Sequence, residues 1–305
     1  MDLEKLIKDK RKIKENSLKS YLIILKKLNE NKEILDLGYL KDTKKIEAMI
    51  REKALTTQRN YLGAILVVLS AYNKAEFDDA LQFYRDMLDQ LNEEYQNLLK
   101  SHEKDPKQSK NWTTIDNLKK AMNKLKRDIE ERGITKKDTL TNKELMLLQR
   151  YVIASLYLLQ PPIRLDFSMD VVSKRSDIED GKNYLLNQGR NKKKFIFSEY
   201  KTSKSYDTKE VELNSKLNKV MNIWLKYNKS GFLLVNNRGG KLSSNGLGKL
   251  IPKVFESTNK HITLNLIRHI YISENVDLDA VNKAKKLAED MLHSSSTQVD
   301  YIKTD

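Results

Sequence analysis

Residues 141–166, TNKELMLLQRYVIASLYLLQPPIRLD, separate two regions of the chain that differ in composition. The stretch opens with the Thr-x-x-Glu spacing of a capping box, which satisfies backbone N–H groups at the start of a helix. Apolar residues then recur at helical spacing up to Pro161–Pro162, where a helix cannot continue. The stretch therefore predicts a largely buried helix that ends shortly before Arg164.

The region before this helix is expected to be entirely helical. Its first 135 residues contain only one proline and three glycines, so few residues interrupt a helix. Apolar residues recur at helical spacing in four segments: 17–28, 56–72, 77–99 and 115–129. The polar stretch 101–110 is typical of a loop, and residues 136–138 are typical of a linker. We therefore expect a helical domain over residues 1–135.

After residue 166 the composition changes, and short runs of aromatic and branched residues alternate with clusters of Gly, Asn and Lys. Runs at 184–186, 195–197 and 211–213 predict a small three-stranded antiparallel sheet. Helical patterns return over four later segments: 215–227, 243–257, 263–274 and 278–292. The expected fold class is mainly α with a small antiparallel β-sheet, and the second domain is expected to span residues 136–305.

The charge of the chain favours an anionic partner. Its 305 residues include 57 Lys and Arg against 42 Asp and Glu, a net charge of +15. Such an excess is typical of proteins that bind nucleic acid, with double-stranded DNA as the first candidate. The alternative is an AT-rich coding bias that fills surfaces with Lys and Asn. Because there is no cysteine, disulfides, cysteine zinc sites and thiol catalysis are excluded.

No stretch of the sequence has the pattern of a membrane span or a leader. The longest apolar run, residues 62–71, is too short to cross a bilayer. The first residues lack the basic-then-apolar order of a signal peptide. We expect a soluble intracellular protein, in the cytoplasm or nucleus of a host or in a bacterial nucleoid.

Five residues with side chains suited to phosphate chemistry occur in the order Arg164, Lys201, Arg268, His293 and Tyr301. A phenol is a plausible nucleophile towards a phosphodiester only when cationic donors surround the phosphate. A planar guanidinium can grip two phosphate oxygens at once. The set therefore indicates a site that attacks a phosphodiester through a tyrosine.

In this order the residues resemble the tyrosine recombinase (phage integrase-like) family of DNA breaking and rejoining enzymes. The stretch from Asn265 to His269 is similar to the family's His-x-x-Arg-His box, and the stretch from Leu292 to Tyr301 is similar to its Leu-Gly-His-Ser-Ser…Thr-x-x-x-Tyr ending. Three departures stand out. Asn265 replaces the usual His or Lys, Pro-Pro replaces Gly before Arg164, and His293 precedes Tyr301 by eight positions (301 minus 293), not nine.

The resemblance implies a role for each residue of the site. Arg164 and Arg268 would hold the phosphate, with Asp166 able to orient Arg164. Lys201, favoured over Lys204, would protonate the leaving oxygen, and Lys204 would contact DNA. The remaining catalytic candidates are His293 as a proton acceptor or phosphate donor, Asn265 as a hydrogen-bond donor and Tyr301 as the nucleophile. Asn265 cannot shuttle protons, which leaves its part in catalysis open.

The family's activity would be site-specific cleavage and rejoining of DNA through a 3′-phosphotyrosyl bond, without metal, cofactor or ATP. The resemblance also implies a helical core-binding domain, a mixed α/β catalytic domain and a homotetramer on two DNA duplexes. Integration or excision of a virus or other mobile element would suit the Lys- and Asn-rich composition. In the first domain, Thr57 and Gln58 are candidates for groove contacts and Arg59 for the DNA backbone.

Three other interpretations stay open at this point. A type IB topoisomerase shares the chemistry but reseals the same strand as a monomer. A DNA-binding protein that has lost catalysis would explain Asn265 and the Pro-Pro pair before Arg164. A basic helical protein with coincidental motifs is the third.

Overall fold

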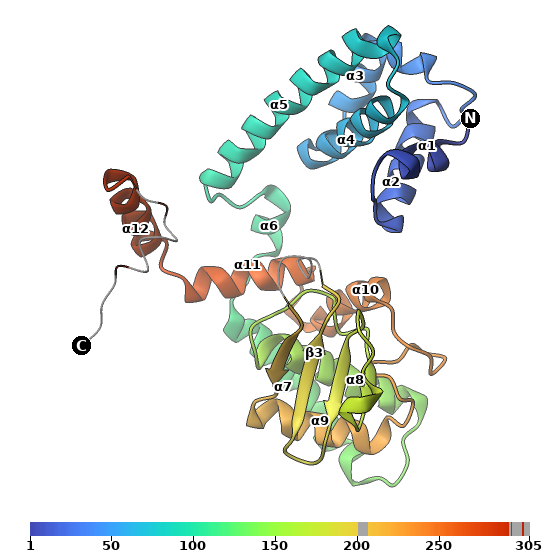
Figure 1. The fold of residues 1–305 in the computed structure, drawn as a ribbon. Helices are drawn as coiled ribbons and strands as arrows, with labels where there is room; N and C mark the ends of the chain where they lie inside the picture. Colours follow the sequence, from blue (N-terminus) through green and yellow to red (C-terminus); the bar gives the residue numbers. More distant parts are fainter. Residues whose placement is uncertain (201–206, 293, 295–300, 302–305) are drawn as a thin grey trace. The chain divides into compact units, whose positions relative to one another are not determined.

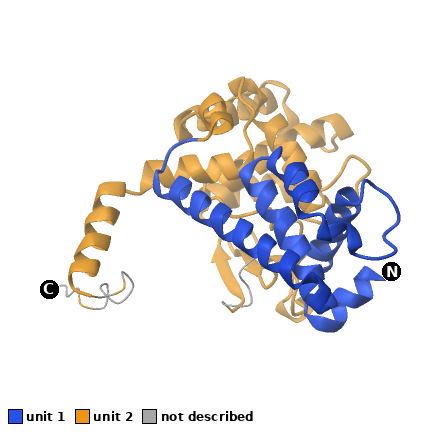
Figure 2. Ribbon diagram, turned by 90° about the horizontal axis from the view of Figure 1, so that it is seen from above, with its two compact units in different colours: residues 1–104 blue, residues 105–305 orange. Residues whose placement is uncertain are grey.

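The computed structural model describes residues 1–200, 207–292, 294 and 301, which divide into two compact units, Met1–Lys104 and Asp105–Asp305 (Figures 1 and 2). The sequence placed this division after residue 135. The difference is α7 (Ile115–Glu131), which belongs to the second unit because its apolar face packs against α8 (Asn142–Leu158). No helix within the described residues is long and apolar enough to span a membrane.

The first unit is helical, as the sequence predicted. Its α-helices are α1 (Leu3–Lys10), α2 (Glu15–Leu28), α3 (Thr43–Arg51), α4 (Leu55–Tyr72) and α5 (Asp78–Lys100), with 3-10 turns η1 (Gly38–Lys41) and η2 (Ala75–Phe77). Helix α4 is the centre of the unit, because it packs against α5, α2, α1 and α3 and buries Leu62, Ile65 and Leu69. It ends at Asn73, whose left-handed backbone closes the helix through its N–H group.

In the second unit, helices pack against one face of a small sheet (Figure 1). After α6 (Pro106–Asn111), α7, η3 (Ile134–Lys136) and α8 come the strands β1 (Asp170–Val172), β2 (Tyr184–Asn187), β3 (Lys193–Phe197) and β4 (Lys209–Glu212), with η4 (Arg175–Asp177) between β1 and β2. They are followed by α9 (Ser215–Tyr227), α10 (Ser244–Val254), η5 (Glu256–Thr258), α11 (Leu264–Asn275) and α12 (Leu278–Asp290).

The sheet has four strands in the order β1-β2-β3-β4 and is mixed, not antiparallel throughout. The three predicted strands are confirmed as β2, β3 and β4, which pair antiparallel with Leu185 opposite Phe195 and Phe195 opposite Val211. The additional strand β1 pairs parallel with β2. It was missed because Asp170–Val172 is a three-residue strand with no alternating pattern to recognise.

The predicted helix over residues 142–158 is confirmed as α8, the buried centre of the second unit. The capping box forms, with Thr141 and Glu144 each accepting from the other's backbone N–H. Tyr157 of α8 meets Phe167 edge-to-face at 5.5 Å between ring centroids, and Phe167 meets Phe195 of the sheet at 5.2 Å. These rings fix the segment between α8 and β1 onto the core.

Candidate active site

The segment that carries Arg164 is held in place by hydrogen bonds from the surrounding core. Helix α8 ends at Leu158, and Pro161–Pro162 follows. Asn214 Nδ2 donates to Leu159 O at 2.5 Å, and Tyr157 Oη donates to Arg164 O at 3.4 Å. The backbone of Arg164 is therefore anchored while its side chain stays exposed.

Arg268 is positioned by α11. Thr263 caps this helix by accepting from Leu266 N at 3.3 Å, as the sequence predicted. Ile267 and Ile270 are fully buried, which leaves the intervening Arg268 half-buried at the edge of the core. A guanidinium in such a place loses part of its hydration and interacts more strongly with an anion than it would in bulk water.

Arg164 and Arg268 line the same cavity, of about 410 Å³. The other lining residues are Gln160, Pro161, Pro162, Ile163, Asp166, Phe197, Tyr200, Lys209 and Val211. Three cations and one carboxylate thus face an otherwise mostly apolar space, an arrangement suited to an anion such as a phosphate. Within the described residues, no group of three or more His, Asp or Glu side chains could hold a metal ion.

Asp166 interacts with both guanidinium groups. Its carboxyl is half-buried, and this burial raises its pKa above the ordinary value. The positive charges of Arg164 and Arg268 act in the opposite direction on the same pKa. The negative charge of Glu199 raises the same pKa, and Asp166 lines the cavity together with both arginines.

Lys209 is a cavity residue that the sequence analysis did not select. It begins β4 opposite Phe197, and its side chain points to the same face of the strand as Val211, which also lines the cavity. The alternate residues Glu210 and Glu212 pair instead with Lys194. The period of two along β4 is the signal that could have singled out Lys209.

The hairpin between β3 and β4 carries the lysines that the sequence favoured, Lys201 and Lys204, which lie outside the described residues. Its two ends are linked by Tyr200, whose Oη donates to Asp207 O at 3.0 Å. Ser198 and Thr208 are also in hydrogen-bond contact, at 3.0 Å between hydroxyl oxygens. Tyr200, the last described residue before Lys201, is one of the residues that line the cavity.

Of the other predicted site residues, those that the structure describes do not line this cavity. Asn265 and His269 are exposed on α11, and neither is among the described residues that line it. His293 lies outside the described residues. Tyr301 is described, with 63% of its surface exposed, and it does not line the cavity either. It follows α12, a helix in which Ala288 is the only buried residue.

In the first unit, the candidate DNA contacts take part in the fold. Gln58 Nε2 donates to Lys53 O at 2.7 Å and so stabilises the turn between α3 and α4. Arg59 Nε donates to Asn92 Oδ1 at 2.8 Å, and its guanidinium stacks 4.1 Å from the centroid of the Tyr95 ring. Thr57, beside them on α4, is half-buried. For Gln58 and Arg59, a contact with DNA competes with these interactions.

Comparison with known proteins gives a distant structural likeness. No protein-family model matches the chain, and no curated protein matches it. Among solved structures, it is similar to a crystal structure of XerA recombinase, with 14% sequence identity and a TM-score of 0.35. That comparison covers 90% of this chain and 85% of the other.

Proposed function

We propose that the chain is a DNA strand-exchange enzyme of the tyrosine recombinase type, which cleaves and rejoins duplex DNA through Tyr301. The observation that carries the proposal is the shared cavity of Arg164 and Arg268. These two residues were selected from sequence motifs far apart in the chain, and a pair of coincidental motifs has no reason to meet. Lys209 lines the same cavity and adds a third cation to it.

The proposed reaction is a transesterification. Tyr301 Oη attacks the phosphorus, the bond from phosphorus to the 5′-oxygen breaks, and a 3′-phosphotyrosyl bond forms. The leaving 5′-oxygen takes a proton from Lys201, and His293 accepts the proton of the tyrosine. A 5′-hydroxyl of a partner strand then attacks and restores the phosphodiester. Because each step exchanges one phosphate ester for another, no ATP is consumed.

Arg164 and Arg268 would stabilise the transition state of both steps. Negative charge is spread over the phosphate oxygens as the tyrosine attacks, and fixed guanidinium groups are suited to neutralise it. Asp166, which lines the same cavity, would orient Arg164 before DNA binds. Asn265, exposed one turn before Arg268 on α11, would donate a hydrogen bond to a phosphate oxygen.

Covalent trapping tests the proposal. Labelled duplex DNA, nicked close to the expected cleavage point, loses a short 5′-hydroxyl fragment after cleavage, so the protein stays attached to the remaining strand. A protein–DNA band that survives denaturing gel electrophoresis is the expected result. Binding of the same DNA without any such band contradicts strand cleavage.

Lys201→Met is expected to lower the rate of cleavage by about a hundred-fold to ten-thousand-fold, the usual contribution of a general acid. A substrate whose 5′-bridging oxygen is replaced by sulfur restores the rate, because a thiolate leaves without a proton. Lys209→Met, the matched variant in the same cavity, is expected to reduce the rate on both substrates alike, since Lys209 would act only by its charge. Rescue of Lys209→Met instead assigns the proton to Lys209.

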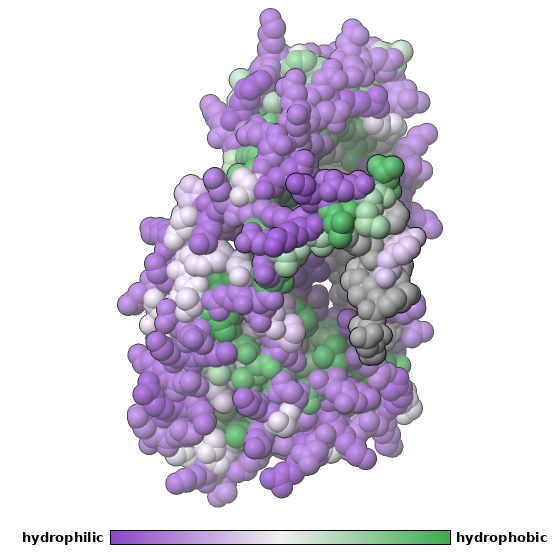
Figure 3. All heavy atoms as spheres, turned by 90° about the vertical axis from the view of Figure 1, so that its left-hand side faces the viewer, coloured by the Kyte–Doolittle hydropathy of each residue, from purple (hydrophilic) through white to green (hydrophobic). Residues whose placement is uncertain are grey.

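The exposed apolar side chains of α12 and of the residues directly after it favour a contact between copies of the protein on DNA. It carries exposed apolar side chains at Leu278 and Leu287, and Met291 and Leu292 directly after it are exposed as well. Figure 3 shows apolar residues at the surface of the face of the molecule on which this helix lies. A helix with exposed apolar side chains that precedes the proposed nucleophile fits a contact with a second copy in the proposed homotetramer on two duplexes.

Leu287→Glu with Met291→Glu is therefore expected to reduce the mass of the protein–DNA assembly. Light scattering after size-exclusion chromatography in the presence of DNA measures this mass. Because both side chains are about half exposed, the thermal midpoint should change little. Asn282→Glu, an exposed position on α12, is the control for added charge. An unchanged mass in the double variant contradicts a role of α12 in assembly.

One alternative function has a specific observation in its favour. A DNA-binding protein without catalysis agrees with the position of Tyr301 outside the cavity and with Asn265 in the place of a proton-transfer residue. Covalent trapping separates it from the proposed enzyme. A topoisomerase-like enzyme would pass that test, and an assay with two duplexes, in which strands must join across molecules, separates it from a recombinase.

A further inference from the structure

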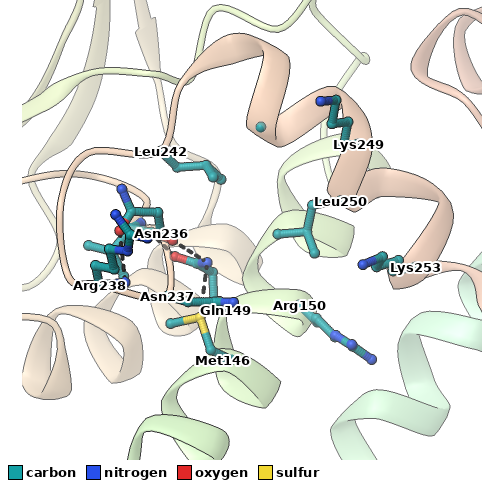
Figure 4. A pocket seen from close by; sticks show the side chains of 12 residues that line it. Met146, Gln149, Arg150, Asn236, Asn237, Arg238, Leu242, Lys249, Leu250 and Lys253 are labelled. Carbon is teal, nitrogen blue, oxygen red and sulfur yellow. Dashed lines mark hydrogen bonds between the residues drawn. The ribbon is translucent and has the colours of Figure 1, made fainter.

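Two clefts on the second unit are lined by cations and lie apart from the Arg164–Arg268 cavity. The first, of about 480 Å³, lies between α8, α10 and the turn at residues 236–240 (Figure 4). The second, of about 540 Å³, lies between α7 and the segment around η5. Neither cleft shares a described lining residue with the Arg164–Arg268 cavity.

Each cleft contains four cations and, among its described lining residues, no carboxylate. The cations of the first cleft are Arg150, Arg238, Lys249 and Lys253, and those of the second are Lys120, Lys124, Arg127 and Lys260. One nearby acid, the exposed Glu256, pairs with Arg150 at 3.1 Å. Like charges gathered in a cleft repel one another and concentrate a positive potential, which an anionic ligand would relieve.

The wall of the first cleft is rigid. Gln149 is buried on α8, and its side-chain amide makes two hydrogen bonds with the backbone of Val235. Its Nε2 donates to Val235 O at 2.8 Å, and its Oε1 accepts from Val235 N at 2.7 Å. Asn236 Oδ1 accepts from Arg238 N at 2.9 Å (Figure 4). It also accepts from Gly240 N at 3.2 Å. The turn that presents Arg238 is thus ordered before any ligand binds, which lowers the entropic cost of binding.

The two clefts are neighbours. Lys253 lines the first and Ser257 lines the second, and residues four positions apart cannot be separated by more than about 14 Å. That distance corresponds to about four base pairs along a DNA duplex. The Arg150–Glu256 pair joins α8 to η5, and α7 packs against both η5 and α8, so the elements around the two clefts are packed together.

We infer that the two clefts form a second binding surface for the sugar-phosphate backbone of duplex DNA, which we call the α7–α10 basic surface. Hydroxyl and amide donors accompany the cations in the second cleft, at Thr113, Asn117, Ser257 and Thr258. Such donors typically bind phosphate oxygens without reading sequence. None of the exposed large apolar residues in the described part of the chain lies in either cleft, so the surface lacks the apolar face of a membrane-binding site.

The inference rests on the proposed function only for the choice of duplex DNA as the ligand. Its position apart from the reaction cavity gives the surface a separate task. It would hold DNA outside the cleavage point, either farther along the same duplex or on a second duplex. Removing its charges should therefore weaken binding and leave cleavage of saturating DNA unchanged.

The test compares two variants with equal loss of charge. The first variant replaces four lysines of the surface by glutamine: Lys120, Lys124, Lys249 and Lys253. The control variant replaces four exposed lysines outside both clefts by glutamine: Lys174, Lys216, Lys219 and Lys229. Affinity for a duplex of random sequence is measured against salt concentration by fluorescence anisotropy. Affinity decreases as salt increases, and the steepness of log affinity against log salt is reduced by about 0.9 for each phosphate that the protein no longer neutralises. We expect a fall of about two to four in the first variant and less than about one in the control.

The outcomes separate this inference from the proposed function. Equal slopes in the two variants overturn the α7–α10 basic surface, whatever the covalent trapping shows. If the wild-type protein forms no covalent complex but the first variant shows a weaker salt dependence than the control, the α7–α10 basic surface is supported and strand exchange is rejected. Loss of cleavage at saturating DNA in the first variant also overturns the inference, because it would make the surface part of the reaction cavity. Melting curves confirm that both variants fold.

Discussion

Tyr301→Phe is expected to abolish the covalent protein–DNA band while leaving DNA binding within about two-fold of wild type, since a substitution at an exposed site changes free energies by less than about 0.5 kcal/mol. Phenylalanine keeps the ring and removes the hydroxyl that forms the phosphotyrosyl bond. Because Tyr301 is 63% exposed, its hydroxyl is not needed to fill a core. Denaturing gels of labelled, nicked DNA report the covalent band, and anisotropy reports binding.

The control for this experiment is Tyr271→Phe. Tyr271 is also in the second unit, packs half-buried against its core and lies outside the Arg164–Arg268 cavity. Loss of its hydroxyl should leave the covalent band intact. A band that persists in Tyr301→Phe shows that another residue is the nucleophile. The absence of a band in the wild type, with binding retained, would support the non-catalytic DNA-binding protein.

Arg268→Ala is expected to slow single-turnover cleavage by about a hundred-fold to a thousand-fold, the range found when one fixed donor to a transition-state oxygen is removed. The loss is large because the guanidinium is half-buried in the same cavity as Arg164, where its charge is screened less than in water. Arg164→Ala should have an effect of similar size. The double variant should lose less than the product of the two, because both arginines act on the same phosphate.

Arg268→Lys should recover only part of the rate, since an ammonium keeps the charge but cannot grip two oxygens in a plane. Arg132→Ala, which removes an exposed arginine outside the cavity, is the matched control and should cleave normally. The rate of appearance of the covalent band, measured with excess protein, is the readout. A normal rate in Arg268→Ala would remove Arg268 from the site and with it the main support for the proposed chemistry.

Much of the fold followed from local patterns in the sequence. Helix α8 was predicted by its capping box, its apolar spacing and the Pro-Pro stop, all of which act within a few turns of chain. Strands β2, β3 and β4 were predicted by short apolar runs between turn residues. The unit to which α7 belongs was not predicted, because an amphipathic pattern shows which face of a helix is buried but not the partner against which that face packs.

The site divides in the same way. Motif order selected Arg164 and Arg268, and the structure places both at one cavity. It could not select Lys209, whose position depends on the pairing of β4 with β3. Motif order also could not show that Gln58 hydrogen-bonds to the α3–α4 turn or that Arg59 hydrogen-bonds to Asn92 of α5, because these partners are set by the packing of the unit. Lys201, Lys204 and His293 lie outside the described residues and stay predictions.

By itself, the sequence determined the helical first unit, the position and cap of α8 and three of the strands. These depend on hydrogen bonds and periodicity within short segments. Only the tertiary structure decided that Arg164, Arg268 and Lys209 share a cavity, that α7 belongs to the second unit and that two cationic clefts lie on that unit. Those facts depend on packing between segments distant in the chain, which no local pattern encodes.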